Sequence, residues 1–404
     1  MLFKLAWRNM WRNKRRTMIT LASVFFAVLL STTMRSLQRG VTVKMIENVV
    51  SFYTGYVQIH KNGYWDEPNL DNTFEQTSAI TKVANDDPRI AKVAPRLESF
   101  ALASSGDISE GCLILGIDPE NENSLTGLGS KLSEGKYLKK GDQGVMVTSG
   151  LAEKLKIGIG DTLILIGQGY QGISAAGIFP VTGIIGFGNP ELNQRLAYLS
   201  LDAARRLYGA ENRLTAFAIN LKKPAFAAAV AKDIRGELDN QYEVMDWAEM
   251  MPEIAQLLEI DKTKGRIVMG ILYMIIGFGM FGTVLMMTSE RRHEFGVLMA
   301  IGMKKRIMAG MVIVESILIS MAGVAAGFMA SIPLIFYFYF NPIRMGGKMA
   351  EAYAEFGLDP IMPMSIEPQI FYSQVFTVLA FAILVSIYPA WSIIRTDPVT
   401  AMKS

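Results

Sequence analysis

The chain has 404 residues, of which 50% are hydrophobic and 19% are charged, with a mean hydropathy of +0.26 and a net charge of +3. Long uncharged stretches lie towards both ends, which excludes a disordered protein and a simple cytosolic globule. The single cysteine, Cys112, excludes an intramolecular disulfide framework and a cysteine-cluster metal site, and two distant histidines, His60 and His293, argue against a histidine metal centre.

Residues 1–16 are basic and contain no acidic side chain. Helical spacing places their aromatic and basic side chains on separate faces. The apolar face consists of Phe3, Trp7, Met10 and Trp11, and the basic stripe consists of Lys4, Arg8 and Arg12. This pattern favours a cytoplasmic helix that lies in the inner-leaflet interface. The alternative is a continuous extension of the span that follows.

Four segments are long and apolar enough to cross a bilayer as helices, since a span needs roughly 20 residues. We predict transmembrane helices at residues 17–37, 266–289, 307–340 and 371–394. The first is expected to be an uncleaved anchor, because no small-x-small cleavage site follows it. The third is longer than one span needs, and Pro333 is expected to kink or end it.

Lysine and arginine in the short flanks predict the orientation of these spans. The link at residues 290–306 carries five basic side chains, whereas the loop at residues 341–370 carries two against four acids. We therefore expect residues 1–16, the link and the tail at 395–404 in the cytoplasm. The loop and the block at residues 38–265 are expected outside.

The block at residues 38–265 alternates between short strand-like and helix-like stretches, which favours an α+β domain with stalk helices. Strands are expected at residues 56–60, 112–117, 162–166 and 196–201, helices at 78–85, 150–155, 201–208 and 224–238, and stalks at 37–52 and 247–264. Residues 40–265 carry 29 acidic and 22 basic side chains, while the remainder carries 8 acidic and 18 basic ones. This split indicates two environments and no nucleic-acid-binding surface.

A glycine-rich stretch, Gly167–Gly172, lies between two expected strands and predicts a hairpin tip. Its candidate contact residues are Gly169, Tyr170 and Gln171. The alternative is a turn without a function.

Residues 277–282 match G-x-G-x-x-G, but they lie inside an uncharged span and do not join a strand to a helix. We interpret these small residues as positions for close helix packing. The chain contains no G-x-x-x-x-G-K-[ST] phosphate loop, so we do not expect it to hydrolyse ATP by itself.

The third span combines a stripe of small residues with one acid. The stripe consists of Ser316, Ser320, Gly323, Gly327 and Ser331, and it predicts close approach of another helix, from this chain or from a second one. Glu315 is the only ionisable residue well inside a span. The spans offer no further ionisable groups for a proton relay, so a hydrogen-bonded structural or coupling role is favoured.

The link at residues 290–306 is short and amphipathic. We predict an apolar docking face of Phe295, Leu298 and Met299, with His293 as a surface or docking residue. A helix held between two spans in this way would transmit a push from a soluble partner. The alternative is a solvated connector.

Three stretches together resemble the permeases of the MacB/FtsX/LolC–LolE superfamily of ABC transporters. They are L-A-W-R-N with R-N-K-R-R-T at residues 5–17, E-R-R-H-E-F-G with A-I-G at 290–302, and Tyr388-Pro389-Ala390 with Asp397-Pro398-Val399 and Ala401. Glu315 also falls where many members have a glutamate. The order of motifs at residues 116–119, 134–137, 155–161 and 199–207 is similar to that of the LolC/LolE branch.

The resemblance implies an external domain between the first two spans and a dimeric core with a second permease subunit, identical or related. It also implies two copies of a separate ATPase, which would hold ATP and Mg²⁺, while this chain would have no catalytic residue, cofactor or metal. The residues implied in coupling to that ATPase are Glu290, Arg291, Arg292, Glu294, Phe295, Gly296, Leu298, Ala300 and Gly302.

The LolC/LolE branch implies extraction of lipoproteins from the bacterial inner membrane and transfer to a periplasmic carrier. The chain departs from that branch at Gly167–Gly172, where the LolC hook is a longer, proline-containing hairpin. Two other functions remain open: MacB-like efflux of a peptide, toxin or glycolipid, and FtsX-like signalling to a cell-wall hydrolase. Membrane lipids are expected neighbours in each case.

Overall fold

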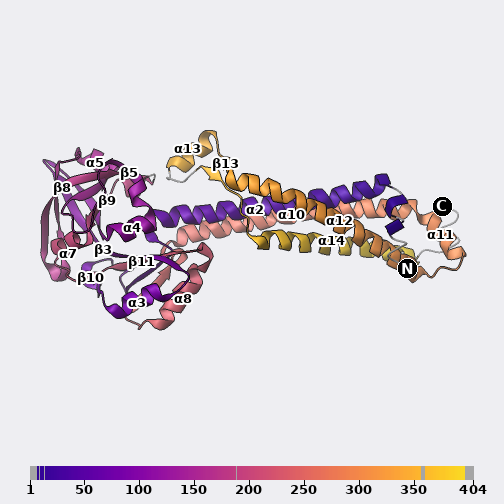
Figure 1. Ribbon diagram of the computed structural model, residues 1–404, viewed down its shortest axis with the longest axis horizontal. Coiled ribbons are helices and arrows are strands. Elements are labelled where there is room, and N and C mark those ends of the chain that lie inside the picture. The colour runs from indigo at the N-terminus through magenta and orange to yellow at the C-terminus, as the bar shows by residue number, and fades with distance from the viewer. Residues whose placement is uncertain (1–6, 9, 13, 188, 356–359, 396–404) are drawn as a thin grey trace. The chain divides into compact units, whose positions relative to one another are not determined.

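The computed structural model describes residues 7–8, 10–12, 14–187, 189–355 and 360–395, and the chain divides into two compact units. The first, here called the membrane unit, comprises Met1–Thr42, Leu258–Arg344 and Ile361–Ser404. The second, here called the α+β unit, comprises Val43–Leu257 and Met345–Pro360. Figure 1 labels their helices and strands.

The membrane unit is built on α2 (Lys14–Val49), α10 (Pro252–Glu290), α12 (Lys305–Phe340) and α14 (Pro368–Arg395), which run alongside one another in Figure 1. In the described part of the chain, four helices are long and apolar enough to cross a membrane, as predicted. Pro333 lies inside α12 and does not end it. In apolar surroundings every backbone group needs an internal partner, which favours continuing the helix beyond the proline.

All four helices contribute to one buried cluster. It consists of Val24, Ala27 and Val28 of α2, Met280 of α10, Val324 of α12, and Val378 and Ala382 of α14. Lipid tails are as apolar as these side chains, so close packing is what holds such helices together.

A segment at residues 361–367, here called the strap, packs against α2 within the membrane unit. It begins with β14 (Ile361–Met362), which pairs with β13 (Ile343–Arg344). The hydroxyl of Ser36 donates to the carbonyl of Ser365 at 2.7 Å, and the amide of Ser365 donates to the carbonyl of Ser36 at 3.1 Å. Arg39 Nε lies 3.1 Å from each carboxylate oxygen of Glu367. The strap thereby ties α2 to the start of α14.

The α+β unit contains a sheet of ten described strands. They are β1 (Val57–Lys61), β3 (Ile90–Ser105), β4 (Ile108–Ile117), β5 (Leu132–Gly135), β6 (Val145–Thr148), β7 (Thr162–Gln168), β8 (Ser174–Ile185), β9 (Leu196–Ser200), β11 (Ala216–Leu221) and β12 (Tyr242–Asp246). Their order is β12-β1-β11-β3-β4-β9-β6-β8-β5, and β7 pairs with both β3 and β8. Only the β4–β9 and β6–β8 pairs of this sheet are parallel.

Helices and a small second sheet complete this unit. The helices are α3 (Ser78–Asp86), α4 (Pro119–Thr126), α5 (Ser149–Leu155), α6 (Pro190–Asn193), α7 (Leu201–Tyr208), α8 (Ala227–Glu237), α9 (Trp247–Met250) and α13 (Gly347–Glu355). The small sheet pairs β2 (Phe74–Glu75) with β10 (Arg213–Leu214). The expected helices at 78–85, 150–155 and 201–208 are present, and the one expected at 224–238 begins at Ala227 after a 3₁₀ turn.

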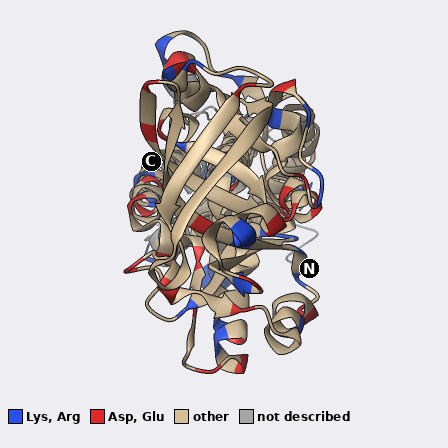
Figure 2. Cartoon of the chain, turned by 90° about the vertical axis from the view of Figure 1, so that its left-hand side faces the viewer, with Lys and Arg blue, Asp and Glu red and all other residues tan. Residues whose placement is uncertain are grey.

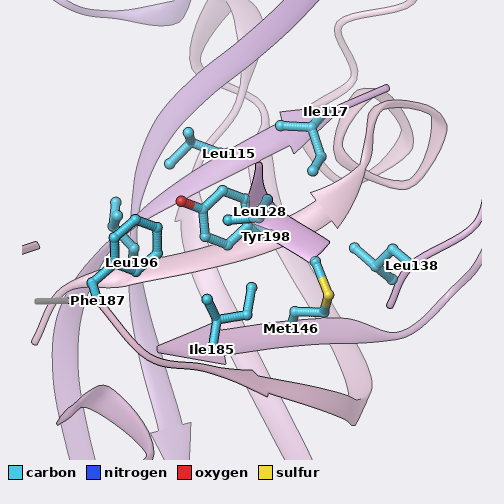
Figure 3. Close-up of a cluster of buried hydrophobic side chains, with 9 residues drawn as sticks. All are labelled: Leu115, Ile117, Leu128, Leu138, Met146, Ile185, Phe187, Leu196 and Tyr198. Atoms are coloured by element: carbon cyan, nitrogen blue, oxygen red, sulfur yellow. The ribbon is translucent and has the colours of Figure 1, made fainter. Parts of the chain in front are cut away.

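The main core of the α+β unit lies around Tyr198, whose ring Figure 3 shows among aliphatic side chains. The cluster consists of Leu115, Ile117, Leu128, Leu138, Met146, Ile185, Phe187, Leu196 and Tyr198. Its members come from β4, β9, β6 and β8, from the turn after α4, and from the loops that contain Leu138 and Phe187. Adjacent strands therefore share one core, which holds this part of the sheet rigid.

A second buried contact in this unit is polar. Arg96 of β3 is fully buried, and it donates to the two carboxylate oxygens of Glu122 at 2.7 and 2.9 Å and to the carbonyl of Tyr53 at 2.6 Å. The Tyr53 hydroxyl donates to Glu98, whose carboxylate also lies 3.7 Å from Arg96 Nη1. Burial raises the pKa of Glu98, and Arg96 only partly offsets this. Tyr53 belongs to the π-helical turn Val50–Thr54 that follows α2, so this network joins that turn to the sheet.

Candidate coupling site

The candidate site lies where α10 and α12 are joined by α11 (Arg292–Ala300). The turn after α11 is a Schellman motif, in which Met303 N donates to Leu298 O and Gly302 N donates to Met299 O, both at 3.0 Å. Gly302 has φ +98°, a backbone conformation that residues with a Cβ rarely adopt. The predicted residue Gly302 therefore sets the direction in which the chain re-enters α12.

A buried ion pair joins this link to α12. Arg291 Nη1 lies 2.7 Å from Glu315 Oε2, and the two side chains are 6% and 1% exposed. Removing either partner would take a counter-charge away from a buried charge, which is costly. Glu315 is hydrogen-bonded as expected, and its partner Arg291 lies in the link, outside the spans.

The ion pair extends into a chain of charged groups towards the N-terminus. Glu294 lies 3.3 Å from Arg291 Nε and also forms an ion pair with Arg12. Partial burial alone would raise the pKa of Glu294, but its hydrogen bonds to Arg12 and Arg291 outweigh this and lower it. The outer pair is largely exposed and adds little stability, so its main effect is to orient the groups.

The apolar face predicted on the link does not face outward as a docking surface. Phe295 is only 3% exposed and packs with Met308, Met311 and Val312 of α12 and Ile393 of α14, while Leu298 and Met299 pack against the same cluster. The periodicity identified an apolar face, but this face points into the membrane unit. The exposed apolar side chains are instead Val297 of α11 and Ile301, which directly follows this helix and is 79% exposed.

The other residues predicted for coupling have mixed surroundings. Glu290 and Ala300 are exposed, and Gly296 is buried. The side chains of Arg292, Pro389 and Ala390 lie outside the described residues, as do Phe3, Lys4 and residues 396–404. In the N-terminal segment, Trp7 and Trp11 are exposed whereas Met10 is buried, so the four-residue apolar face expected there is not uniform.

The small-residue stripe of α12 packs against α2 of the same chain. A Cβ added at Gly323 would lie 2.7 Å from Val24 Cβ, and one at Gly327 would lie 2.7 Å from Phe25 O. Ser331 is fully buried and donates to Phe328 O at 2.8 Å. The stripe therefore contacts a helix of the same chain, which is one of the two alternatives predicted for it.

The glycines of residues 277–282 are packed less closely than expected. A Cβ added at Gly277 would make ordinary contact with Phe381 at 3.7 Å, and one at Gly279 or Gly282 would meet nothing within 4 Å. Close helix packing at these two positions is therefore not seen in the single chain. The segment lies inside α10, which agrees with its rejection as a nucleotide-binding loop.

The predicted hairpin tip is present between β7 and β8, and it is held against the α+β unit. Gln171 N donates to Asp71 Oδ1 at 2.9 Å, and the guanidinium carbon of Arg213 lies 4.4 Å from the ring centre of Tyr170. Gly169 N donates to Ile173 O at 2.6 Å, which closes the turn. These contacts fix the tip in place, unlike a projecting hook.

The sheet next to this tip has an exposed apolar face that sequence reasoning missed. It consists of Phe100 and Leu102 of β3, Ile164 and Ile166 of β7, and Ile178 of β8. Ile178 is 71% exposed, and the strands facing the viewer in Figure 2 carry few charged residues. The sequence signal for this face was the large apolar residue at every even-numbered position in residues 100–102 and 164–166.

The described residues contain no group of three or more histidine, cysteine, aspartate or glutamate side chains that could hold a metal ion. Cys112 is buried in β4, and burial raises the pKa of its thiol to about 12. A thiol with such a pKa stays protonated and unreactive near neutral pH.

The structure thus combines four helices that are long and apolar enough to cross a membrane with a separate α+β unit and a buried ion pair at a short helical link. The family model for the MacB-like periplasmic core domain matches residues 17–237, more than half of the chain, and that for the FtsX-like permease C-terminal region matches residues 266–398. The chain therefore belongs to the MacB/FtsX/LolC–LolE superfamily of ABC transporter permeases. Neither matched region is a catalytic domain, and members of the superfamily work with ABC ATPase partners.

Individual relatives differ in what their names describe. The chain is 26% identical over 335 residues to the lipoprotein-releasing system transmembrane protein LolC of Xylella fastidiosa, covering 80% of this chain and 79% of that protein. It is 24% identical over 417 residues to the pyoverdine export ATP-binding/permease protein PvdT of Pseudomonas syringae pv. tomato, covering 99% of this chain and 58% of that protein. The solved periplasmic region of MacB from Actinobacillus actinomycetemcomitans matches with 16% identity and a TM-score of 0.38, covering 54% of this chain and 98% of that structure.

Proposed function

We propose that this chain is an inner-membrane subunit of an ABC transporter that extracts lipoproteins for delivery to the outer membrane. The observation that carries the choice of cargo is the similarity to LolC, which extends over 80% of this chain and 79% of that protein. The α+β unit up to residue 237 and the link with its ion pair fall within the matched family regions. The basic flanks favour the link in the cytoplasm and the α+β unit in the periplasm.

The proposed mechanism assigns ATP and Mg²⁺ to a separate ATPase, in two copies, that contacts the link. The outer face of α11 would receive the push, and the Arg291–Glu315 pair would pass it to α12. From α12, contacts of Gly323 and Gly327 reach α2, whose far end enters the α+β unit. A second permease subunit, identical or related, would complete the core, and a periplasmic carrier would accept the cargo.

The function is tested by depleting the chain and measuring the distribution of lipid-anchored proteins between inner and outer membranes by quantitative proteomics. We expect outer-membrane lipoproteins to accumulate in the inner membrane. An unchanged distribution would remove lipoprotein release as the function. Export of a small or peptide cargo would then become the leading hypothesis, because the similarity to PvdT extends over 99% of the chain.

If the ATPase docks at α11, a change of Ile301, which directly follows this helix, should weaken ATPase binding. This side chain is 79% exposed and apolar, which suits a residue buried by a partner. We expect Ile301→Ser to weaken co-purification of the ATPase by about tenfold, since truncating one central contact residue costs a complex roughly that much affinity. Ile307→Ser, which changes an exposed isoleucine at the start of α12, serves as the matched control. Equal binding of both variants would exclude this face of α11 as the docking surface.

A further inference from the structure

The strap makes a close, reciprocal contact with α2. Ser36 and Ser365 exchange two hydrogen bonds, and both residues are buried. Gly40 lies one turn further along α2, where an added Cβ would stand 2.0 Å from Pro363 O. A backbone carbonyl cannot turn aside as the end of a flexible side chain can. Only glycine at position 40 therefore allows the strap to lie this close to α2.

Glycine is otherwise a poor choice at position 40. The residue lies inside α2, and glycine in a helix interior is less stable than alanine because it loses more conformational freedom on folding. Its φ is not positive, so the backbone conformation does not require glycine. The close approach of the strap is the feature of the structure that does require it.

The strap is itself held firmly by the two helices that follow the link. Met364 of the strap forms one buried cluster with Ile335 of α12 and with Ile370 and Phe371 of α14, and Leu37 of α2 packs against this cluster. Close-packed side chains pass a displacement on to their neighbours. A shift of α12 and α14 would therefore move the strap with them.

The strap is the second of two places at which this helix pair holds α2. The first is the close packing of Gly323 and Gly327 of α12 on α2 near Val24. At 1.5 Å per residue, Val24 and Ser36 are about 18 Å apart along α2. A helix held at one place can pivot there. A helix held at two separated places must follow its neighbours as a whole.

We propose that the strap is a second point of force transfer to α2, and that Gly40 is the positioning residue that makes this contact possible. A push on the link would shift α12 and α14, and the strap would keep α2 from pivoting about its contact with Gly323 and Gly327. Residues 43–49 of α2 belong to the α+β unit, so the displacement would reach that unit. The proposal rests on the ATP-driven mechanism of the proposed function.

The test is Gly40→Ala in the full chain, reconstituted with its ATPase and an outer-membrane lipoprotein in lipid. The added methyl group would push the strap away from α2, while alanine favours the helix itself. We expect ATPase binding and ATP hydrolysis within twofold of the wild type, with at least fivefold less lipoprotein released per ATP hydrolysed. The ATP-dependent change in amide hydrogen exchange of the α+β unit should fall by a similar factor.

Gly270→Ala is the matched control. It adds the same methyl group inside another spanning helix, α10, where a Cβ would meet nothing within 4 Å. This variant should keep both the release per ATP and the exchange response of the wild type. Wild-type release per ATP in Gly40→Ala, or an equal loss in both variants, would overturn the proposal.

A disulfide tests the contact without disturbing position 40. Ser36→Cys with Ser365→Cys places two thiols at the reciprocal contact, and the native Cys112 is buried and does not compete. Because the strap and α2 are proposed to move together, the oxidised protein should release lipoprotein at the wild-type rate. A loss of release on oxidation that a reductant reverses would show that the contact opens in each cycle, which would also overturn the proposal.

The exchange measurement distinguishes failure of this proposal from failure of the proposed function, because it does not depend on the cargo. An exchange response in Gly40→Ala equal to that of the wild type excludes the strap as a point of force transfer, even if depletion confirms lipoprotein release. If depletion leaves lipoproteins in place but the response is lost only in Gly40→Ala, the cargo is wrong and the role of the strap stands.

Discussion

Replacing Arg96 by alanine is expected to lower the free energy of unfolding of the α+β unit by about 3–5 kcal/mol, the usual cost of removing one partner from a buried ion pair. Arg96 is fully buried and makes three hydrogen bonds, two of them to Glu122. Its loss would leave the carboxylates of Glu122 and Glu98 together in an apolar environment. Amide hydrogen exchange of β3 and β4 in the full chain measures the effect.

Two control variants distinguish the effect of breaking the buried network from the effect of losing a positive charge. Arg206→Ala removes an exposed arginine from α7 of the same unit and should change the unfolding free energy by less than about 0.5 kcal/mol. The double variant Arg96→Met with Glu122→Leu should recover much of the stability, because apolar side chains of similar size often replace a buried pair without loss. Exchange rates in Arg96→Ala equal to those of the wild type would contradict the role assigned to this network.

The same network also joins the turn after α2 to the sheet. Arg96 donates to the backbone of Tyr53, and the Tyr53 hydroxyl donates to Glu98, so the turn after α2 is bonded to the sheet at two points.

Much of the membrane unit could be predicted because its signal is local. A span is a continuous apolar run, so the four helices follow directly from composition. The strands at 112–117 and 162–166 were found for a related reason, since short apolar runs bounded by glycine or aspartate are recognisable. The 16-residue strand β3 was missed because Pro95 and charged residues interrupt its pattern. It pairs with β4, which follows it directly, but also with β7 and β11, which lie far along the chain and outside any local window.

The candidate site was harder to predict because its contacts join distant parts of the chain. Arg291 and Glu315 were each singled out, but their pairing depends on the turn at Gly302. Phe295, Leu298 and Met299 form the apolar face that helical spacing predicts. Spacing cannot decide whether such a face turns outward or inward, and here α12 and α14 provide apolar side chains for it to pack on.

The second large effect is expected at the Arg291–Glu315 pair. Arg291→Ala would remove a counter-charge from the buried Glu315, which should destabilise the membrane unit by about 3–5 kcal/mol. Glu315→Gln keeps a hydrogen-bond acceptor for Arg291 and should impair transport only partly. Arg306→Ala, which removes an exposed basic residue at the start of α12, is the control for charge. Thermal unfolding of the purified chain and ATP-dependent release of lipoprotein are the two measurements.

The double variant Arg291→Met with Glu315→Leu decides whether the pair couples or only stabilises. Apolar side chains can fill the site, so the variant should unfold near the wild-type temperature. It would nevertheless break the charged connection from Arg12 and Glu294 to α12, since Arg291 contacts both Glu294 and Glu315. We therefore expect normal folding and ATPase binding with transport reduced at least tenfold. Transport at the wild-type rate would show that the pair only maintains the fold, and that the push reaches α12 through the packing of Phe295 on Met308 and Met311.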